Sequence, residues 1–226
     1  MKAVAIILAA GEARKMGHPK ALIEHEGGRS FLQSLASTFG KAGCSIIGVV
    51  GHDGDAVREQ HPAVHLVESE RWQDGQLSSV KAGIEAALQE GADAVLLHPV
   101  DMPALRASTI KTLLKGLNDG MDGLRPEFEG ALGYPLVLSR AAAERLYGGD
   151  SGETQLEAAV RGMQVRRIAV KDPGVVVNLN TPEIYERLFG SAPKLAPPPK
   201  RRSKRSDTPT AAPPMEEVAS EGMSGT

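Results

Sequence analysis

Glycines and basic residues alternate just after the first apolar segment of the chain. Gly11 and Gly17 flank Arg14 and Lys15, and Lys20 follows three residues after Gly17. Glycine lets the backbone come close to a ligand, and successive N–H groups can point at phosphate oxygens. Three cations would offset much of the charge of a triphosphate. The residues therefore predict a phosphate-binding loop; the alternative is an ordinary loop with solvated basic side chains.

This loop differs from the two common phosphate-binding motifs. Five residues separate Gly11 from Gly17, and His18-Pro19 follow. A Walker A loop has four residues between its glycines and continues Gly-Lys-Ser/Thr, and the dinucleotide fingerprint reads G-x-G-x-x-G. Neither pattern is present at this position.

An aspartate, Asp101, follows the apolar run Ala94–Leu97 in the sequence His-Pro-Val-Asp-Met-Pro. In open α/β sheets, ligands bind beyond the carboxyl ends of the strands. Asp101 and the basic loop should therefore lie at the same edge of the sheet. Mg²⁺ prefers one or two hard oxygen ligands, completed by waters and substrate phosphates. Asp101 is thus a candidate metal ligand; the alternative is a residue that caps a turn.

A third group of polar residues surrounds Trp72. Gly75 would permit close backbone approach, and Gln76, Ser78 and Ser79 offer hydrogen bonds to a ligand. The alternative is that Trp72 packs in the core and that Ser79 caps a helix over Val80–Leu88.

The first loop carries a specific resemblance. The pattern L-A-A-G-x-x-x-x-M-G-x-P-K-x-L over residues 8–22 resembles the signature of the MobA-like nucleotidyltransferases. It is most similar to the molybdenum cofactor cytidylyltransferase branch, which has Leu-Ala-Ala-Gly where guanylyltransferases have Leu-Ala-Gly-Gly. The family pattern usually continues x-S-x-R-M-G, and here Ala13 and Lys15 stand at the serine and arginine positions. Lys15 keeps the charge but loses the planar, bidentate fork of arginine.

The resemblance implies roles for individual residues. Lys15 and Lys20 would hold the triphosphate, and Val-Asp-Met-Pro resembles the family's Asp-x-Pro, whose carboxylate binds Mg²⁺. The segment Asn178-Leu179-Asn180-Thr-Pro-Glu resembles the closing motif D-x-D-T-P-E-D, so Asn178 would be the second metal contact. Asparagine between strand and helix also suits a capping or turn role. The implied nucleotide-binding residues are Leu8, Ala9, Ala10, Gly11, Arg14, Gly75, Gln76 and Ser79.

Two weaker motifs imply an acceptor site. Gly133-Tyr134-Pro135 resembles a segment that usually reads Gly-His-Pro, and residues 149–154 resemble Gly-Asp-x-Gly-Ala-Arg. Tyr134 and Thr154 depart from these patterns, and Thr154 removes a basic residue near the acceptor phosphate.

Together the motifs predict transfer of a nucleoside monophosphate from an NTP, with CTP expected, to a phosphorylated small molecule such as molybdopterin, with release of pyrophosphate. The acceptor phosphate is already an anion, so catalysis would be positioning and charge neutralisation. One alternative is a nucleotide-binding regulatory protein without turnover, given the departures at Lys15, Thr154 and Asn178. Another is a sugar-phosphate nucleotidyltransferase, or a sugar transferase on a similar fold; the latter typically needs an Asp-x-Asp pair, and only Asp101 is present.

The elements that must position these residues follow a regular order in the first half of the chain. Short apolar runs predict buried strands, and Ser30 would cap a helix through Phe39. Strands that alternate with helices indicate βαβ units. We therefore expect an α/β, three-layer, Rossmann-like nucleotidyltransferase fold with a mostly parallel sheet. The expected strands are Val4–Leu8, Ser45–Val50, Val64–Val67 and Ala94–Leu97.

The second half is less regular. Residues 125–134 form a glycine-broken segment, and a final helix should run to Leu188 with Thr181 as cap and Pro182 in its first turn. The other expected elements are strands at Pro135–Leu138, Arg166–Val170 and Val175–Leu179, and helices at Arg140–Leu146 and Gln155–Val160.

Composition limits the class of protein. The 226 residues are 41% hydrophobic and 24% charged, which is typical of globular proteins, and the net charge of −2 argues against nucleic acid as a main partner. No apolar run approaches the ~20 residues of a membrane helix, so no membrane partner is expected. The single cysteine, Cys44, suits a small buried hydrophobe and a reducing compartment. With no secretory signal visible, the expected location is the cytoplasm.

The composition changes at Ser191. We expect a nucleotidyltransferase domain over residues 1–190 and a disordered Pro/Ser/basic tail over residues 191–226, which should be dispensable. The tail contains the basic run at positions 200–205, which could hold an unknown anionic partner or simply be solvated.

Overall fold

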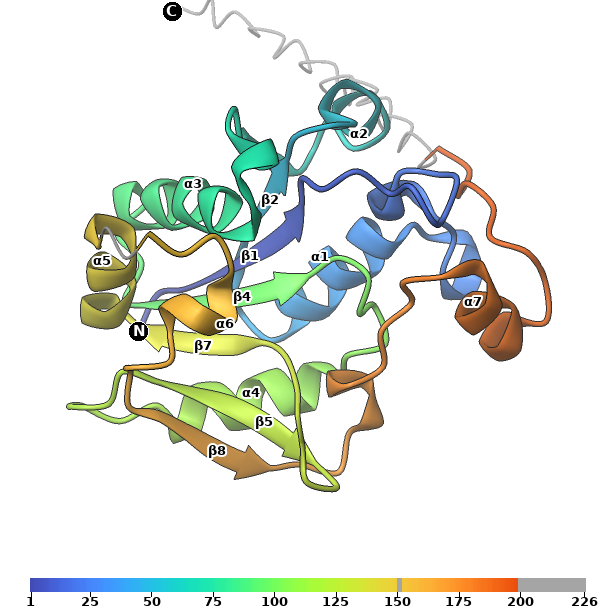
Figure 1. The fold of residues 1–226 in the computed structure, drawn as a ribbon. Helices are drawn as coiled ribbons and strands as arrows, with labels where there is room; N and C mark the ends of the chain where they lie inside the picture. The colour runs from blue at the N-terminus through green and yellow to red at the C-terminus, as the bar shows by residue number, and fades with distance from the viewer. Residues whose placement is uncertain (150–151, 199–226) are drawn as a thin grey trace, which may run out of the picture.

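A single twisted sheet carries the site, and helices cover both of its faces (Figure 1). The computed structural model describes residues 1–149 and 152–198. Its strand order is β3-β2-β1-β4-β7-β5-β6, and β8 pairs with β5. The strands are β1 (Ala3–Ala9), β2 (Ser45–Val50), β3 (His65–Glu68), β4 (Ala94–Pro99), β5 (Gly123–Phe128), β6 (Ala131–Leu132), β7 (Leu136–Ser139) and β8 (Val165–Ala169).

The half of the sheet that matters for the site is parallel. Strands β3, β2, β1 and β4 run in one direction, and β7 is the first antiparallel strand, paired with β4. The carboxyl ends of β1, β2 and β4 therefore lie at one edge. The helices are α1 (Phe31–Lys41), α2 (Gly54–Gln60), α3 (Gln76–Gln89), α4 (Ala107–Gly116), α5 (Arg140–Gly148), α6 (Leu156–Ala159) and α7 (Pro182–Phe189).

Strand β1 is buried on both faces, as its unbroken apolar sequence predicts. Ala5 and Ile7 pack in the core cluster under α1 and α4, whereas Val4 and Ile6 pack in the second cluster under α3 and α5. This alternation makes three layers, and it confirms the predicted α/β architecture with a mostly parallel sheet. Cys44 is buried, and desolvation raises the pKa of its thiol to about 11, so the thiol is neutral.

Helix boundaries follow local capping chemistry. The Ser30 side chain accepts a hydrogen bond from the Gln33 N–H, and Thr181 caps α7 with Pro182 in the first turn, both as predicted. Helix α3 instead begins at Gln76, because Gly75 occupies the cap with φ of +114°. Ser79 therefore lies inside the helix, and the alternative in which it caps a helix over Val80–Leu88 is wrong.

The predicted strand over Val175–Leu179 is also wrong. A 3-10 turn, η4 (Pro173–Val175), occupies its start, because the Asp172 side chain accepts a hydrogen bond from the Gly174 N–H. The residues after η4 are irregular, and the Leu179 N–H donates to the Asp101 carbonyl at 2.7 Å. The segment thus joins the strand-end loop of β4 instead of the sheet.

The C-terminal segment does not leave the body at Ser191 as expected. The Ala196 N–H donates to the Leu22 carbonyl and the Glu24 N–H donates to the Lys194 carbonyl, both at 2.8 Å. The Gln60 side chain also donates to the Ala196 carbonyl. We call residues 194–196 the C-terminal strap. The rest of the expected disordered tail, from residue 199, lies outside the described residues.

No helix within residues 1–149 and 152–198 is long and apolar enough to cross a membrane.

Two truncations should separate the strap from the residues beyond it. Deleting residues 199–226 removes none of the described contacts, so the melting temperature should stay within about 1–2 °C. Deleting residues 191–226 removes the strap's hydrogen bonds, each worth ~1 kcal/mol, and should lower the melting temperature by roughly 5–10 °C. Differential scanning calorimetry of both variants is the measurement, and equal melting temperatures would show that the strap contributes no stability.

Candidate active site

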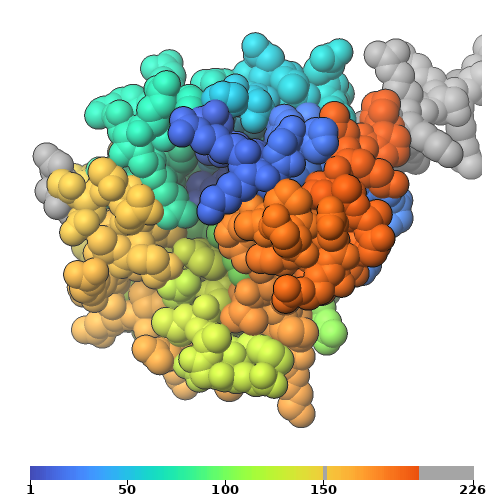
Figure 2. Space-filling model, turned by 45° about the vertical axis from the view of Figure 1, so that its right-hand side comes forward, coloured from blue at the N-terminus to red at the C-terminus, as the bar shows by residue number. Residues whose placement is uncertain are grey.

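The carboxyl ends of β1 and β4 open into a cavity of about 460 Å³. Its walls come from the loop after β1, from the turn after β4, and from the 3-10 turn η3 (Trp72–Asp74) with the start of α3. In Figure 2 a hollow lies below the blue N-terminal loop, between the green segment on the left and the orange C-terminal segment on the right. The predicted edge of the sheet is therefore concave.

Two buried side chains anchor the glycine-containing loop. Ala13 and Met16 pack in the core, and the Met16 N–H donates to the Ala13 carbonyl at 2.9 Å. Gly17 then takes a φ of +69°, which favours glycine. The loop is thus fixed to the body at its centre while Gly11 lines the cavity.

Lys20 connects the loop to two distant parts of the chain. Its Nζ lies 2.7 Å from Asp101 Oδ2 and 2.7 Å from Asn180 Oδ1. The side chains of Lys20 and Asp101 are only 24% and 12% exposed, so the ion pair is largely shielded from solvent. Asp101 and Asn180 follow Lys20 by 81 and 160 positions in the sequence, and both contact its ammonium group.

The other oxygen of Asp101 remains available. Asp101 Oδ1 is buried and has no hydrogen-bond partner among the described residues, and the same is true of Asn178 Oδ1. A buried, unpaired carboxylate oxygen is costly unless a cation or donor completes it. Within the described part of the chain there is no group of three or more His, Cys, Asp or Glu residues that could cage a metal. The donor set fits a hard ion held by one or two protein oxygens, as Mg²⁺ is when substrate phosphates complete its shell.

Close approaches of the backbone at two glycines bring η3 and the start of α3 against neighbouring segments. A Cβ at Gly51 would lie 2.7 Å from the Ala10 carbonyl oxygen and from the Trp72 ring, and one at Gly75 would lie 2.8 Å from Thr154. Only glycine permits these contacts. The Ser79 hydroxyl is buried and donates to Ser69 Oγ at 3.0 Å, which fixes the end of β3 against α3.

The cavity collects most of the residues that the sequence singled out. Those that line it are Leu8, Ala9, Ala10, Gly11, Lys20, Gly75, Gln76, Ser79 and Asp101. Arg14, Lys15 and Asn178 are not among its lining residues. Arg14 is drawn aside by Glu12, whose carboxylate accepts from Arg14 Nε at 2.6 Å, and Lys15 is exposed.

Several lining residues were not predicted as site residues. The cavity is also lined by Glu12, Gln73, Pro99, Val100 and Gln155. Asn180, and not Asn178, makes the contact with Lys20. Both asparagines flank Leu179, whose backbone is bonded to Asp101, so sequence alone could not choose between them.

His98 supports the turn that carries Asp101. Its Nε2 lies 2.9 Å from the Met102 carbonyl, and its ring packs edge-on against Phe39. Complete burial lowers the pKa of His98 to about 4, although the Met102 carbonyl and Asp101 act in the opposite direction. His98 is therefore a neutral donor at physiological pH, and not a ligand or base in the cavity.

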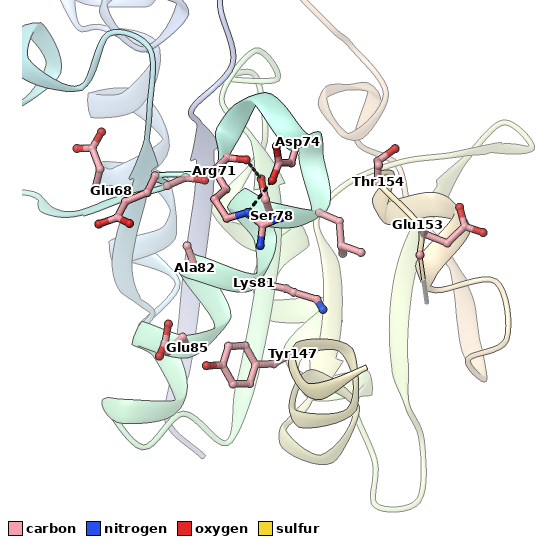
Figure 3. Close-up of a pocket in the computed structure, with 14 residues that line it drawn as sticks. Glu68, Arg71, Asp74, Ser78, Lys81, Ala82, Glu85, Tyr147, Glu153 and Thr154 are labelled. Carbon is pink, nitrogen blue, oxygen red and sulfur yellow. Dashed lines mark hydrogen bonds and ion pairs between the residues drawn. The ribbon is translucent and has the colours of Figure 1, made fainter. Parts of the chain in front are cut away.

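A second, larger cavity of about 830 Å³ lies on the other side of η3 and shares no lining residue with the first. In Figure 3, Lys81 and Glu85 project from α3 and Tyr147 approaches Glu85. Several of its charged groups are paired with near neighbours: Arg71 Nε contacts Asp74 Oδ2 at 2.6 Å, and Lys81 Nζ donates to the Gly149 carbonyl. Among the residues of these two cavities that the structure describes, Asp101 carries a buried oxygen without a hydrogen-bond partner.

The parallel sheet, the loop and the acidic strand end define a nucleotide-binding α/β protein. The family model of the MobA-like NTP transferase domain matches residues 5–170. The chain therefore belongs to this family and is a nucleotidyltransferase.

The names of individual relatives refer to different activities. A probable molybdenum cofactor guanylyltransferase from Opitutus terrae is 29% identical over 191 residues, which cover 80% of this chain and 92% of that protein. A nicotine blue oxidoreductase from Paenarthrobacter nicotinovorans is 29% identical over 160 residues, 65% of this chain and 77% of that protein.

Among solved structures, Rv0371C of Mycobacterium tuberculosis in complex with manganese is similar with a TM-score of 0.65. The match is 22% identical and covers 85% of this chain and 100% of that chain. At this identity the likeness shows the shared fold.

The neutral state of His98 makes stability depend on pH. In the unfolded chain the ring has a pKa near 6.5, whereas in the folded chain it is about 4. Between these values only the unfolded chain binds the proton, so stability falls as the pH falls from about 6.5 to 4. Each unit of difference between the two pKa values is worth ~1.4 kcal/mol, so the free energy of unfolding should fall by roughly 3 kcal/mol.

The substitution His98→Gln tests this, because the amide can still donate to the Met102 carbonyl but cannot titrate. Urea unfolding is measured between pH 7 and pH 4. Over this range the free energy of unfolding of the wild type should fall by roughly 3 kcal/mol more than that of the variant. Parallel curves for the two proteins would show that His98 is protonated in the fold.

Proposed function

We propose that this protein transfers a nucleoside monophosphate from an NTP to the phosphate of a molybdopterin-like acceptor and releases pyrophosphate. The observation that carries the proposal is the contact of Lys20 with Asp101 and Asn180 in a cavity lined by the glycine-containing loop. A cation next to an unpaired carboxylate oxygen would suit a triphosphate and its metal ion, which supports the proposal. The name of the Opitutus terrae relative supports the class of acceptor.

In this reaction the protein would mainly position the two substrates and neutralise their charge. The acceptor phosphate is already a nucleophilic anion, so no side-chain nucleophile or strong base is required. Lys20 would neutralise oxygens of the triphosphate, and backbone N–H groups after Gly11 would orient them. The exposed side chain of Lys15 extends from the same loop and would reach the outer phosphates.

A divalent cation is part of the proposal. Asp101 Oδ1, with Asn178 or Asn180, would hold it, and Mg²⁺ suits this oxygen set. When bound, the ion would supply charge neutralisation at the α-phosphate. The manganese complex of Rv0371C supports a divalent ion in this fold. A location in the cytoplasm, with no nucleic-acid partner, remains a prediction from the sequence.

CTP is the nucleotide we propose, and Ala10 is the reason. Ala10 lines the cavity and is 4% exposed, and its carbonyl is fixed by the His52 N–H at 3.1 Å. Its methyl group would narrow the cavity where the guanylyltransferase branch has glycine, which would disfavour the larger purine. The relative's name supports GTP instead, so both nucleotides belong in the test.

Pyrophosphate release separates this proposal from the alternatives. The purified protein is mixed with Mg²⁺, CTP or GTP, and molybdopterin or sugar phosphates as acceptors. Release that depends on molybdopterin supports the proposal. Release with a sugar phosphate alone indicates a sugar-phosphate nucleotidyltransferase, and nucleotide binding without release indicates a regulatory protein. Turnover of a redox dye with NADH or NADPH would point to the activity named for the oxidoreductase relative.

Asp101→Asn should reduce pyrophosphate release by on the order of 10²-fold or more, because the neutral amide weakens a metal contact worth several kcal/mol. Asp122→Asn is the matched control, since Asp122 contacts Arg145 on the surface and lines neither the loop nor the turn after β4. Steady-state rates and melting temperatures of both variants are measured. Wild-type turnover in Asp101→Asn would remove Asp101 from the site.

Ala10→Gly should narrow the ratio of kcat/KM for CTP over GTP. One methyl-sized difference is worth roughly 10- to 200-fold at most, so the change should be modest and turnover should persist. Competition kinetics with both nucleotides on the wild type and the variant give the ratio. A wild-type preference for GTP, or a ratio that the substitution leaves unmoved, would contradict the assignment of base choice to this loop.

A further inference from the structure

An arginine is buried in the sheet at some distance from the phosphate loop. Arg125 lies in β5 and is 7% exposed. A buried guanidinium is costly unless it is paired and hydrogen-bonded. Its Nε donates to the Gly133 carbonyl at 3.1 Å, and its guanidinium lies 4.6 Å from the centroid of the Tyr134 ring.

The remaining partner of Arg125 is a carboxylate that faces solvent. Arg125 Nη1 donates to Glu157 Oε1 at 3.0 Å and to Oε2 at 2.7 Å, and the Tyr134 hydroxyl donates to Oε1 at 2.7 Å. Burial alone would raise the pKa of Glu157, but the hydrogen bonds from Arg125 and Tyr134 outweigh it and lower the pKa. Glu157 is therefore a fixed anion, and its side chain is still 57% exposed.

One acceptor position of this carboxylate is free. Oε1 accepts two hydrogen bonds, whereas Oε2 accepts only from Arg125 among the described residues. An ionised carboxylate has about four lone-pair sites, so Oε2 can take a further donor. Because the oxygens are already oriented, that donor would meet a preorganised group.

Glu157 is not a lining residue of the cavity that holds Lys20 and Asp101, but two neighbours connect it to that cavity. Gln155, two residues before it, lines the cavity that holds Lys20 and Asp101. Tyr134 lies with its ring 6.4 Å from that of His98, which supports the Asp101 turn. In Figure 2, yellow to orange segments from the second half of the chain border the hollow on the side away from the blue loop.

Because Glu157 is paired with Arg125, this end offers no net positive charge to a phosphate. The family motif that residues 149–154 resemble has a basic residue at the position of Thr154. Here Glu157, held by the Tyr134 hydroxyl, instead offers an oxygen that accepts hydrogen bonds. The acceptor phosphate must lie nearer Lys20, and the opposite end of the acceptor, which bears N–H donors, would lie near Glu157.

We propose that Glu157 Oε2 accepts a hydrogen bond from the exocyclic amino group of a 2-amino-4-oxopyrimidine ring, and that Arg125 and Tyr134 position it. This rests on the proposed function, because the pterin of a molybdopterin-like acceptor has this ring. Guanine shares the same amino group, so the nucleotide is a second source of the same chemistry. Glu157 is thus a specificity-determining residue, and no bond is made or broken on it.

Matched probes distinguish this role from a structural ion pair. The first pair is 6-(phosphooxymethyl)pterin and 6-(phosphooxymethyl)lumazine, which differ in an amino or an oxo group at one ring position. The second pair is GTP and ITP, which differ by the same amino group on a purine. Binding of each to the full-length protein is measured by equilibrium dialysis, which needs no turnover.

The wild type should bind the pterin about 10- to 100-fold more tightly than the lumazine, the range expected for a hydrogen bond to a charged group. In Glu157→Gln the amide oxygen at the Oε1 position can keep the bonds from Tyr134 and from Arg125 Nη1, whereas the 2.7 Å contact of Nη1 with Oε2 is lost because the amide nitrogen takes that position. A donor replaces an acceptor, so the preference should vanish or invert towards the lumazine. Tyr134→Phe should weaken pterin binding by several-fold but keep the preference.

Glu144→Gln is the control, because Glu144 is an exposed carboxylate that accepts from Arg140 Nε at 2.8 Å on α5. It should leave both ratios unchanged. If Glu157→Gln shifts the GTP-to-ITP ratio and not the pterin-to-lumazine ratio, the amino group that Glu157 contacts is that of guanine.

A Glu157→Gln variant that weakens both members of each pair equally, or leaves both ratios as in the wild type, overturns the proposal. The outcome is independent of the reaction. Altered binding ratios without pyrophosphate release would refute the proposed transfer and keep the role of Glu157, whereas release with unaltered ratios would do the reverse.

Discussion

The contact of one lysine with two distant oxygens organises this molecule. Lys20 can meet Asp101 and Asn180 only if the loop after β1, the turn after β4 and the segment before α7 converge. The parallel register of β1 and β4 brings the first two together, and the bond from the Leu179 N–H to the Asp101 carbonyl brings the third. The pair is largely shielded from solvent, so its attraction is stronger than that of a surface pair.

The segments that meet at Lys20 also bury polar oxygens that have no hydrogen-bond partner in the described part of the chain. Asp101 Oδ1 and Asn178 Oδ1 stay buried without partners among the described residues. Such groups reduce stability, and they persist where a ligand completes them. The C-terminal strap and the neutral His98 act in the opposite direction, because they hold the segment after Lys20 and the turn of Asp101 in place.

Charge is distributed unequally along the cavity. On the loop side Lys20 lines the cavity and suits a phosphate, and Lys15 is exposed on the same loop. Near Gln155, which also lines the cavity, Arg125 and Tyr134 hold the carboxylate of Glu157. Under the proposed function, a ligand with phosphate at one end and an amino-bearing ring at the other would match this arrangement.

The sequence by itself determined the fold class and most of the loop side of the site. Buried strands with unbroken apolar runs and helices with serine or threonine caps are local signals, and the Leu-Ala-Ala-Gly loop is contiguous. These signals located Gly11, Lys20 and Asp101, all of which line the cavity. The strand expected over Val175–Leu179 and the alternative cap at Ser79 were wrong, because Asp172 and Gly75 form local caps that periodicity does not reveal.

Only the tertiary structure decided which residues meet across long separations. It selected Asn180 over Asn178 at Lys20, turned Arg14 towards Glu12, and paired the strap with Leu22 and Glu24. It also joined Arg125 in β5, Tyr134 in the connection before β7, and Glu157 in α6. A side chain's partner depends on which backbone segments converge and on which carbonyls remain unpaired there. No local pattern in the sequence contains that information.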